Sequence, residues 1–405
     1  MGARPQFTTA SAGTCYTMGM RDVAILSAVR TPIGRAPKGS LRNTRPDDLA
    51  ALVVREALAR AGLDGSRVDD LILGCAQPER EQGFNLARLV GLLANLPHEV
   101  PGVTVNRLCA SGLQAVAMGA ERIACGGIDV ALAGGVESMT MVPLGPGPAS
   151  PNPALAHLAP AGLSMGHTAE AVARRFGISR DEQDAFALDS HRKAVAAWLA
   201  GRMAAEVVAV RTRVQVEDGS FAPLTFERDE CPRADTSRAA LAALRPAFLA
   251  DGSVTAGNSS PRSDGAAAVV LMEAARAHRE GCQARAHFRA FTVVGVDPVL
   301  MGVGPVPAVR KLLAKAGLAA DDIDLYELNE AFAAQAVYCV RELGLPLDRV
   351  NVNGGAIALG HPLGATGARQ LTTALHELER RQGRWAVITM CIGLGMGAAG
   401  LIERT

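Results

Sequence analysis

Residues 59–74 read ARAGLDGSRVDDLILG, and residues 314–329 read AKAGLAADDIDLYELN. Each stretch has the pattern of a helix end, then Ala-Gly-Leu, a polar loop, and a Val-Asp or Ile-Asp pair that opens an apolar strand. Each is followed by a second expected strand ending in Val-Asn, at Asn106 and at Asn353. A loop of small residues, an amphipathic helix and another apolar strand come next in both copies. This self-similarity predicts a duplicated α/β unit with buried sheets.

The chain between the two copies has a different texture. Residues 138–258 contain a Pro/Gly-rich segment, a helical stretch and a charged, loop-rich section before the strand pattern AAAVVLM resumes at residues 266–272. Such an insertion in an α/β enzyme commonly covers the active site. We therefore predict an N-terminal half (21–137 and 259–291), an inserted loop domain (138–258) and a C-terminal half (292–405).

Composition indicates a soluble globular protein of more than one packed unit. The chain has 405 residues, of which 49% are hydrophobic and 20% charged, with a net charge of +1. That balance gives no electrostatic case for nucleic acid or acidic membranes as partners. No run is long and apolar enough to span a bilayer. The four lysines among many arginines are typical of a GC-rich bacterial gene.

The cysteines are dispersed, without a C-x-x-C pair or a zinc-like spacing. This usage indicates a reducing compartment, and we expect a cytoplasmic protein in which most cysteines are small core residues. The scattered histidines and acids likewise predict no metal site. The eight cysteines are Cys15, Cys75, Cys109, Cys125, Cys231, Cys282, Cys339 and Cys391.

Residues 1–20 form a separate segment. They contain Arg, Ser and Thr but no acid, as a transit peptide would, and they lack the apolar core of a secretory signal. Met20 directly precedes the first expected strand, DVAILSAV at residues 22–29. We therefore favour a disordered leader or an upstream start over a targeting signal.

Cys109 lies in NRLCASG, residues 106–112, between an expected strand and an expected helix. In the first turn of a helix, the macrodipole and the unpaired backbone N–H groups favour the thiolate. We therefore expect its pKa to lie below the free value of about 8.5. The small residues Ala110, Ser111 and Gly112 leave room for a substrate carbonyl. A buried structural thiol is the alternative.

His361 lies in NGGAIALGHPLGATGAR, residues 353–369, the matching loop of the second copy. Because ligands gather at the carboxyl ends of strands in such sheets, pseudo-symmetry predicts that this loop faces the Cys109 loop. The imidazole would then take the thiol proton. The alternative is a loop histidine whose nitrogens bind backbone.

Two further candidates follow expected strands. Cys391 opens CIGLGMG at a strand end, where glycines expose bare N–H groups; the alternative is a core thiol at a glycine turn. Asn329 lies in ELNEAFAAQA, and its alternative is the simple capping of the next helix.

Two glycine patterns do not support nucleotide binding. GMGAAG at residues 395–400 matches G-x-G-x-x-G, but the helix and the acid that a dinucleotide site needs do not follow it. GGAIALGHP lacks the Gly-Lys-Ser/Thr of a phosphate-binding loop. We expect neither a nicotinamide cofactor nor nucleoside triphosphate chemistry.

Taken together, the segments resemble the thiolase family, the acyl-CoA C-acyltransferases, from about Arg21 to the C-terminus. The resemblance implies a duplicated five-layer α-β-α-β-α architecture with an inserted CoA-binding loop domain. It also implies no cofactor, because CoA is a substrate, and a homodimer or homotetramer. The matching stretches are SAVRTPIGR, NRLCASGLQAV, AGGVESMT, SMGHTAE, VTAGNSSPRSDGAA, MGVGPVPA, LNEAFA, NGGAIALGHPLGATGAR and CIGLGMG.

The resemblance also implies roles for individual residues. Cys109 carries the acyl group as a thioester, His361 activates it, and Cys391 moves the proton at the α-carbon of acetyl-CoA. Asn329 holds a water that forms one oxyanion hole with His361, and the N–H groups of Cys109 and Gly393 form the second. Substrate or CoA contacts fall to Met165, Ala256, Ser260, Met301 and Phe332.

The motifs look more like degradative 3-ketoacyl-CoA thiolases of fatty acid β-oxidation than short-chain acetoacetyl-CoA thiolases. The short-chain enzymes tend towards HMGTTAE, and here Ser164 stands in place of that histidine. The pair Pro261-Arg262 fits neither pattern. Two other readings are a decarboxylating ketoacyl synthase-type enzyme, against which Cys391 and its glycines argue, and an inactive acyl-CoA- or lipid-binding relative.

Overall fold

The computed structural model describes residues 20–144, 152–158, 164–216 and 218–405. Its centre is one ten-stranded sheet made of two half-sheets that meet where β1 pairs antiparallel with β9 over two residue pairs. In spatial order the strands are β10 (Leu325–Leu328), β11 (Trp385–Ile392), β12 (Met396–Arg404), β9 (Ala286–Gly295), β1 (Val23–Arg30), β8 (Ser263–Glu273), β5 (Val130–Ser138), β3 (Asp70–Gly74) and β4 (Gly102–Val105), with the short β2 (Gly34–Arg35) against β8.

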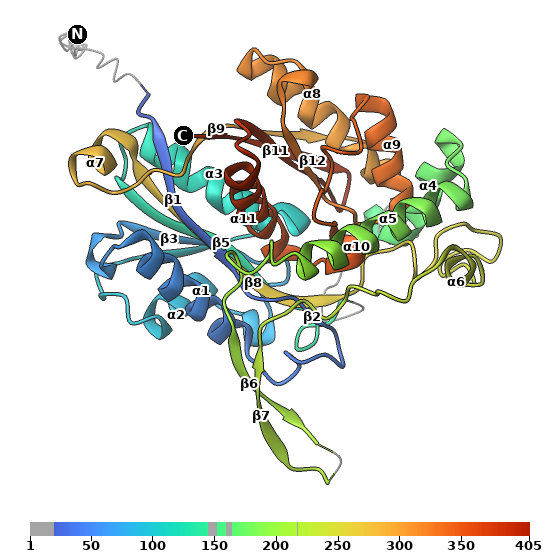
Figure 1. Cartoon of the computed structure of the whole chain (residues 1–405), viewed down its shortest axis with the longest axis horizontal. Helices are drawn as coiled ribbons and strands as arrows, with labels where there is room; N and C mark the ends of the chain where they lie inside the picture. The colour runs from blue at the N-terminus through green and yellow to red at the C-terminus, as the bar shows by residue number, and fades with distance from the viewer. Residues whose placement is uncertain (1–19, 145–151, 159–163, 217) are drawn as a thin grey trace, which may run out of the picture.

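Helices cover both faces of each half-sheet, which gives five layers (Figure 1). Helices α1 (Pro46–Ala61) and α2 (Leu86–Leu93) pack outside the N-terminal half-sheet, and α8 (Pro305–Ala316) and α9 (Ala333–Leu343) outside the C-terminal one. Helices α3 (Ser111–Ala124) and α11 (Leu363–Arg381) lie between the two. Because β1, β5 and β8 are buried on both faces, their sequences are almost continuously apolar. The predicted architecture is confirmed.

The repeated Ala-Gly-Leu is a helix terminus in both copies. Gly62 ends α1 with φ 65°, and Gly317 ends α8 with φ 68°. This left-handed conformation suits glycine and lets the N–H groups bind the last carbonyls of the helix. The short helices η1 (Gly65–Arg67) and η6 (Ala320–Asp322) follow, and then β3 and β10, which pair in parallel with β5 and β11.

The prediction of a strand ending at Asn353 is wrong. Its counterpart β4 forms, but residues 350–353 make only an isolated bridge between Val350 and Tyr326. The reason is Asn351, which has φ 45°. Its side-chain amide donates to Leu328 O at 2.8 Å and accepts from Leu328 N at 2.9 Å. The side chain thus supplies the bonds that a backbone ladder would have made.

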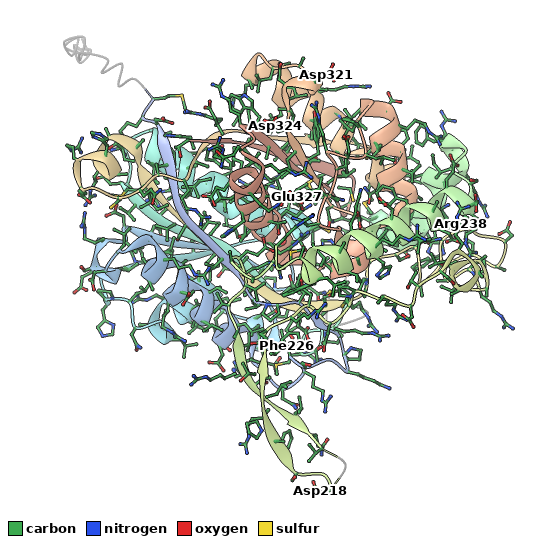
Figure 2. The ribbon with its side chains drawn as sticks, in the orientation of Figure 1. Asp218, Phe226, Arg238, Asp321, Asp324 and Glu327 are labelled. Carbon is green, nitrogen blue, oxygen red and sulfur yellow. The ribbon has the colours of Figure 1, made fainter. Side chains whose placement is uncertain are left out.

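The inserted segment folds over the C-terminal half and extends beyond it. It contains α4 (Met165–Phe176), α5 (Arg180–Leu199), α6 (Arg238–Ala242) and the hairpin β6–β7 (Val210–Gln215, Phe221–Phe226). The hairpin projects from the body, with Phe226 at its base and Asp218 near its tip (Figure 2). The remaining elements are η2 (Arg80–Gln82), η3 (Leu108–Ala110), η4 (Pro153–Leu158), α7 (Ala274–Arg279), η5 (Pro298–Val303) and α10 (Ala356–Leu359).

The leader proposed for residues 1–20 lies outside the described residues except for Met20, which is exposed and precedes β1. Among the helices of the described ranges, none combines the length and the apolar character needed to cross a membrane.

Candidate active site

Cys109 lies in the turn between β4 and α3. The turn is the 3-10 helix η3, and α3 begins only at Ser111, so the placement of Cys109 in the first α-helical turn is wrong by two residues. The Ser111 hydroxyl accepts from Arg107 N at 2.9 Å and donates to Leu108 O at 2.7 Å. Asn106 Oδ1 accepts from Leu108 N at 2.8 Å. These bonds hold the sulfur in a fixed, buried position.

The Cys109 loop and the His361 loop lie against each other, as the repeat predicts. A Cβ added to Gly112 would sit 2.6 Å from Gly364 O, so the first turns of α3 and α11 touch through their backbones. Gly112 therefore permits close helix packing, which corrects the expectation that it leaves room for a substrate carbonyl. Ala110 and Ser111 are also fully buried.

His361 is buried and held in one tautomer. The Thr366 hydroxyl donates its only proton to Pro362 O at 2.9 Å, so at 2.6 Å it must accept from His361 Nδ1–H. On the other side of the ring, Asn329 Nδ2 lies 3.3 Å from Nε2. Nε2 is therefore the ring nitrogen without a proton, and it accepts from the Asn329 amide. Since both ring nitrogens bind side chains, the reading of a backbone-satisfied loop histidine is wrong.

Asn329 directly follows β10. Its N–H donates to Thr389 O at 2.9 Å, its side chain is buried, and it faces His361. Helix α9 starts at Ala333 with Phe332 as its N-cap residue, so the reading of Asn329 as a helix cap is wrong. Asn329 Oδ1 has no protein partner among the described residues.

The glycine turn that contains Cys391 and Gly393 lies next to the turn that carries Cys109. The N–H of Gly393 points at the Cys109 sulfur. A Cβ on Gly393 would lie 3.1 Å from Leu108 Cδ1, in the turn that carries Cys109. Cys391, fully buried near the end of β11, is close enough for a Cys109 thiolate to oppose its ionisation. The structure therefore brings the two thiols and the Gly393 N–H together, and it pairs His361 with Asn329 next to the loop that packs against the start of α3.

The low pKa expected for Cys109 is wrong. Burial raises the pKa of this thiol to about 11, although the N–H groups of Gly393 and of Cys109 itself act in the opposite direction. Burial, and then the charge of Cys109, raise the pKa of Cys391 well above its ordinary value. Burial and the charge of Arg369 lower the pKa of His361 to about 3. For Cys109, the loss of hydration on burial outweighs the stabilisation of the thiolate that we expected from the helix terminus. Both thiols and the imidazole are therefore neutral at pH 7.

These shifts predict how the free enzyme reacts with iodoacetamide. A thiol with a pKa near 11 is protonated at neutral pH, and its thiolate fraction rises about tenfold per pH unit below that pKa. The rate of alkylation at Cys109, followed by peptide mass spectrometry, should therefore climb steadily between pH 7 and 9. A rate that is already level below pH 7 would instead reveal a thiolate–imidazolium pair.

The predicted substrate-contact residues divide into two groups. Met165, Met301 and Phe332 pack with Cys391 in one apolar cluster that also holds Phe248. Ser260 lies on the neighbouring loop, where its N–H and hydroxyl both donate to Ala331 O at 3.0 Å. Ala256 is exposed and outside the cluster.

Phe248 was missed from the sequence. Its ring meets Phe332 edge-on at 6.0 Å and His167 at 6.2 Å. It comes from an irregular loop of the insertion, RPAFLADG, where no periodicity marks the inward-facing residue.

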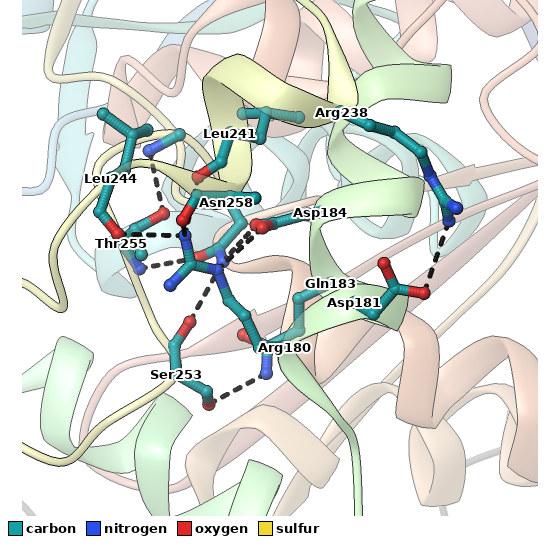
Figure 3. A network of polar contacts seen from close by, with 12 residues as sticks. Arg180, Asp181, Gln183, Asp184, Arg238, Leu241, Leu244, Ser253, Thr255 and Asn258 are labelled. Carbon is teal, nitrogen blue, oxygen red and sulfur yellow. Dashed lines mark hydrogen bonds and ion pairs between the residues drawn. The ribbon is translucent and has the colours of Figure 1, made fainter.

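A polar network that the sequence also did not reveal braces this loop (Figure 3). Arg180 Nη2 donates to Leu241 O at 2.6 Å and to Leu244 O at 3.0 Å, and its Nε pairs with Asp184 at 2.7 Å. Asn258 Nδ2 donates to Asp184 Oδ1 at 2.9 Å. Helix α5 thereby fixes both ends of the segment that carries Phe248.

The candidate site contains a buried thiol beside backbone N–H donors, a neutral imidazole and a second thiol. These are the functional groups that a cysteine-dependent acyl-transfer enzyme needs. Comparison with known proteins gives the family. The family model "Thiolase, N-terminal domain" matches residues 23–275, and "Thiolase, C-terminal domain" matches residues 282–404. The chain belongs to the thiolase family, and it is an acyl-CoA C-acyltransferase.

Individual relatives also carry names from the thiolase family or share its fold. The chain is 52% identical to a 3-ketoacyl-CoA thiolase of Bacillus subtilis, over 95% of this chain and 100% of the relative. It is 47% identical to the peroxisomal 3-ketoacyl-CoA thiolase 2 of Arabidopsis thaliana, over 95% and 84%. The crystal structure of the Bacillus anthracis acetyl-CoA acetyltransferase superposes with a TM-score of 0.88 at 39% identity, covering 96% of this chain and 100% of that one.

Proposed function

We propose that this thiolase cleaves 3-ketoacyl-CoA with CoA, giving acetyl-CoA and a shortened acyl-CoA, through an acyl-enzyme on Cys109. The observation that carries the proposal is the approach of the Gly393 N–H and Cys391 to the Cys109 sulfur, in a turn that packs against the segment following the His361–Asn329 pair. The names of the relatives in Bacillus subtilis and Arabidopsis thaliana support the substrate class.

The first half-reaction uses both thiols. The Cys109 proton passes to His361 Nε2 while the sulfur attacks the C3 carbonyl. The C2–C3 bond then breaks, the acyl group stays on sulfur as a thioester, and Cys391 protonates the carbon of the departing acetyl-CoA enolate. Because thiolate is both a strong nucleophile and a good leaving group, one residue serves both half-reactions.

The second half-reaction restores the enzyme. The CoA thiol gives its proton to the Cys391 thiolate and attacks the acyl thioester. Cys109 leaves as thiolate and recovers the proton held by the His361 imidazolium. Negative charge develops on oxygen in both halves, and removing one preorganised donor typically costs ~10²–10³ in rate. The N–H groups of Cys109 and Gly393 serve the acyl carbonyl, and Asn329 with His361 serves the acetyl-CoA oxygen through a bound water.

Cleavage assays across chain lengths test this function. The loss of the magnesium–enolate absorbance of 3-ketoacyl-CoA, with CoA added, should be faster for medium chains than for acetoacetyl-CoA. The reason is the apolar cluster of Met165, Phe248, Met301 and Phe332 around Cys391, which offers contacts to a longer chain. Absence of cleavage at every chain length would reject the proposal.

Short-chain acetoacetyl-CoA thiolase activity is the second candidate. The fold of the Bacillus anthracis acetyl-CoA acetyltransferase matches this chain over nearly its full length. Cleavage confined to acetoacetyl-CoA would establish that function in place of the first. The Ser164 hydroxyl, bonded to His167 Nδ1 at 2.8 Å, occupies the position where we expect a histidine in short-chain enzymes.

We also propose a homodimer formed through the edge of β4. This strand ends the sheet, and Val103 is 37% exposed. Phe84, at 95% exposure, and the half-exposed Leu92 and Leu93 belong to the same part of the chain. An open strand edge beside exposed apolar side chains favours antiparallel pairing with a second copy across a two-fold axis.

Light scattering of a β4 variant tests the dimer. Val103→Lys should convert a dimer into a monomer, because a buried lysine would face its own symmetry mate. Leu199→Lys, at a 77% exposed position on α5, is the control and should leave the mass unchanged. A wild-type monomer, or a Val103→Lys dimer of unchanged stability, would contradict the assignment.

Cytoplasmic location is likewise our proposal. The seven cysteines of the described residues are all free thiols, which suits a reducing compartment. Immunodetection after cell fractionation should find the protein in the cytoplasmic fraction; recovery from a secreted or membrane fraction would contradict this.

A further inference from the structure

A buried ion pair lies behind the candidate active site. Arg369 of α11 is 1% exposed, and Glu327 of β10 is fully buried near the middle of the molecule (Figure 2). Arg369 Nη1 lies 3.5 Å from Glu327 Oε2. Within the described residues, no nitrogen of this guanidinium and no oxygen of this carboxylate makes a hydrogen bond to protein. Buried charges without hydrogen bonds are costly, so the pair calls for an explanation.

The neighbouring charges are already engaged. Arg30 pairs with Glu206 at 2.6 Å and with Asp229 at 2.8 Å. Glu206 also accepts from the Thr373 hydroxyl at 3.1 Å. Glu327 is therefore the carboxylate left for Arg369 among the described residues. Burial raises the pKa of Glu327 to about 8, while the charge of Arg369 opposes that shift. Burial likewise lowers the pKa of Arg369, and the charge of Glu327 opposes that shift.

The two residues lie on the elements that adjoin the His361–Asn329 contact: Asn329 directly follows β10, and His361 lies two residues before α11. Glu327 precedes Asn329 by two residues at the end of β10. Arg369 follows Thr366 by three residues in α11, so both lie on one side of that helix. Thr366 is the partner of His361 Nδ1. The pair thus connects the strand that delivers Asn329 to the helix that orients His361.

We propose that Arg369 and Glu327 are positioning residues for the acyl-transfer reaction, which fix the separation between the Asn329 amide and the His361 imidazole without touching substrate. The inference rests on the proposed function. Asn329 Nδ2 and His361 Nε2 lie 3.3 Å apart, and an oxyanion hole built from both tolerates little displacement. A misplacement of about 1 Å at a reacting centre can cost roughly 10² in rate.

Steady-state kinetics of Glu327→Gln, Arg369→Met and the double variant test the proposal, with rates normalised to Cys109 titrated by alkylation. Each single variant should lower kcat about 10- to 100-fold with KM changed less than about threefold. The double variant should be no slower than the slower single, because one interaction is lost in all three. Arg369→Lys, which keeps the charge, should recover much of the kcat.

Glu377→Gln is the matched control. Glu377 is also buried on α11, eleven residues beyond Thr366, and it pairs with Asn353 and Arg380. This variant should keep the wild-type kcat per titrated site. A kcat loss in Glu377→Gln equal to that of Glu327→Gln would reduce the pair to general support of the helix and overturn the proposal.

Two further results would overturn it. One is a wild-type kcat in the nearly isosteric Glu327→Gln, which decides the matter even where Arg369→Met does not fold. The other is strictly multiplicative losses in the double variant. Full activity of Cys109→Ala, in contrast, would refute the proposed function itself, so the two failures can be told apart.

Discussion

Replacing Cys109 by alanine should abolish turnover, with kcat for 3-ketoacyl-CoA cleavage falling roughly 10⁴-fold or more. The alanine variant has no sulfur beside the Gly393 N–H to carry the acyl group. Cys109 lies in a turn held by the Ser111 hydroxyl and the Asn106 side chain, so the substitution should leave the fold intact.

The control is Cys125→Ala, which removes an exposed free thiol just beyond the end of α3. It should retain wild-type kcat and KM. An active Cys109→Ala protein, or an acyl adduct detected on that variant by mass spectrometry, would show that another residue is the nucleophile.

Replacing Cys391 by alanine should separate the two kinds of chemistry. Carbon–carbon bond cleavage and condensation should fall roughly 10²–10⁴-fold, because no group remains to move the proton at the α-carbon. Transfer of an acyl group from acyl-CoA to Cys109 makes and breaks only thioester bonds, and it should persist. Condensation is measured by acetoacetyl-CoA formation, and acylation by the mass of the intact protein.

Cys339→Ala is the matched control, since Cys339 is also a fully buried free thiol and donates to Gly302 O within the core. Both activities should survive in it. If Cys391→Ala condensed at the wild-type rate, the proton-transfer role would belong elsewhere; if it also failed to acylate, Cys391 would be needed to position Cys109.

Much of the fold could be predicted because the duplication leaves local signals. The two Ala-Gly-Leu segments mark helix ends whose left-handed glycines are chemically required, and the continuously apolar strands indicate a sheet covered on both faces. The expected strand at residues 350–353 failed for a reason that no pattern carries. The Asn351 side chain takes over the ladder bonds, and this is visible only once Leu328 lies beside it.

The candidate site was also predictable only where the sequence carries a local signal. The loops of Cys109 and His361 were predictable from matching places in the two copies, and Asn329 and Cys391 were proposed from the strand ends that they follow. Their protonation states were not, because burial sets the pKa of Cys109 and burial arises from the whole fold. Residues that act through tertiary contacts, such as Arg180 beneath the substrate loop and Arg369 behind His361, carry no local sequence signal.

Locating the acyl group on the enzyme tests directly whether Cys109 is the nucleophile. The wild-type protein is incubated with a medium-chain 3-ketoacyl-CoA and a substoichiometric amount of CoA, quenched in acid, digested, and mapped by tandem mass spectrometry. We expect one hydroxylamine-sensitive acyl adduct, on Cys109, that disappears when excess CoA is added. An adduct on Cys391 or on any other residue, chemically competent for transfer to CoA, would contradict it.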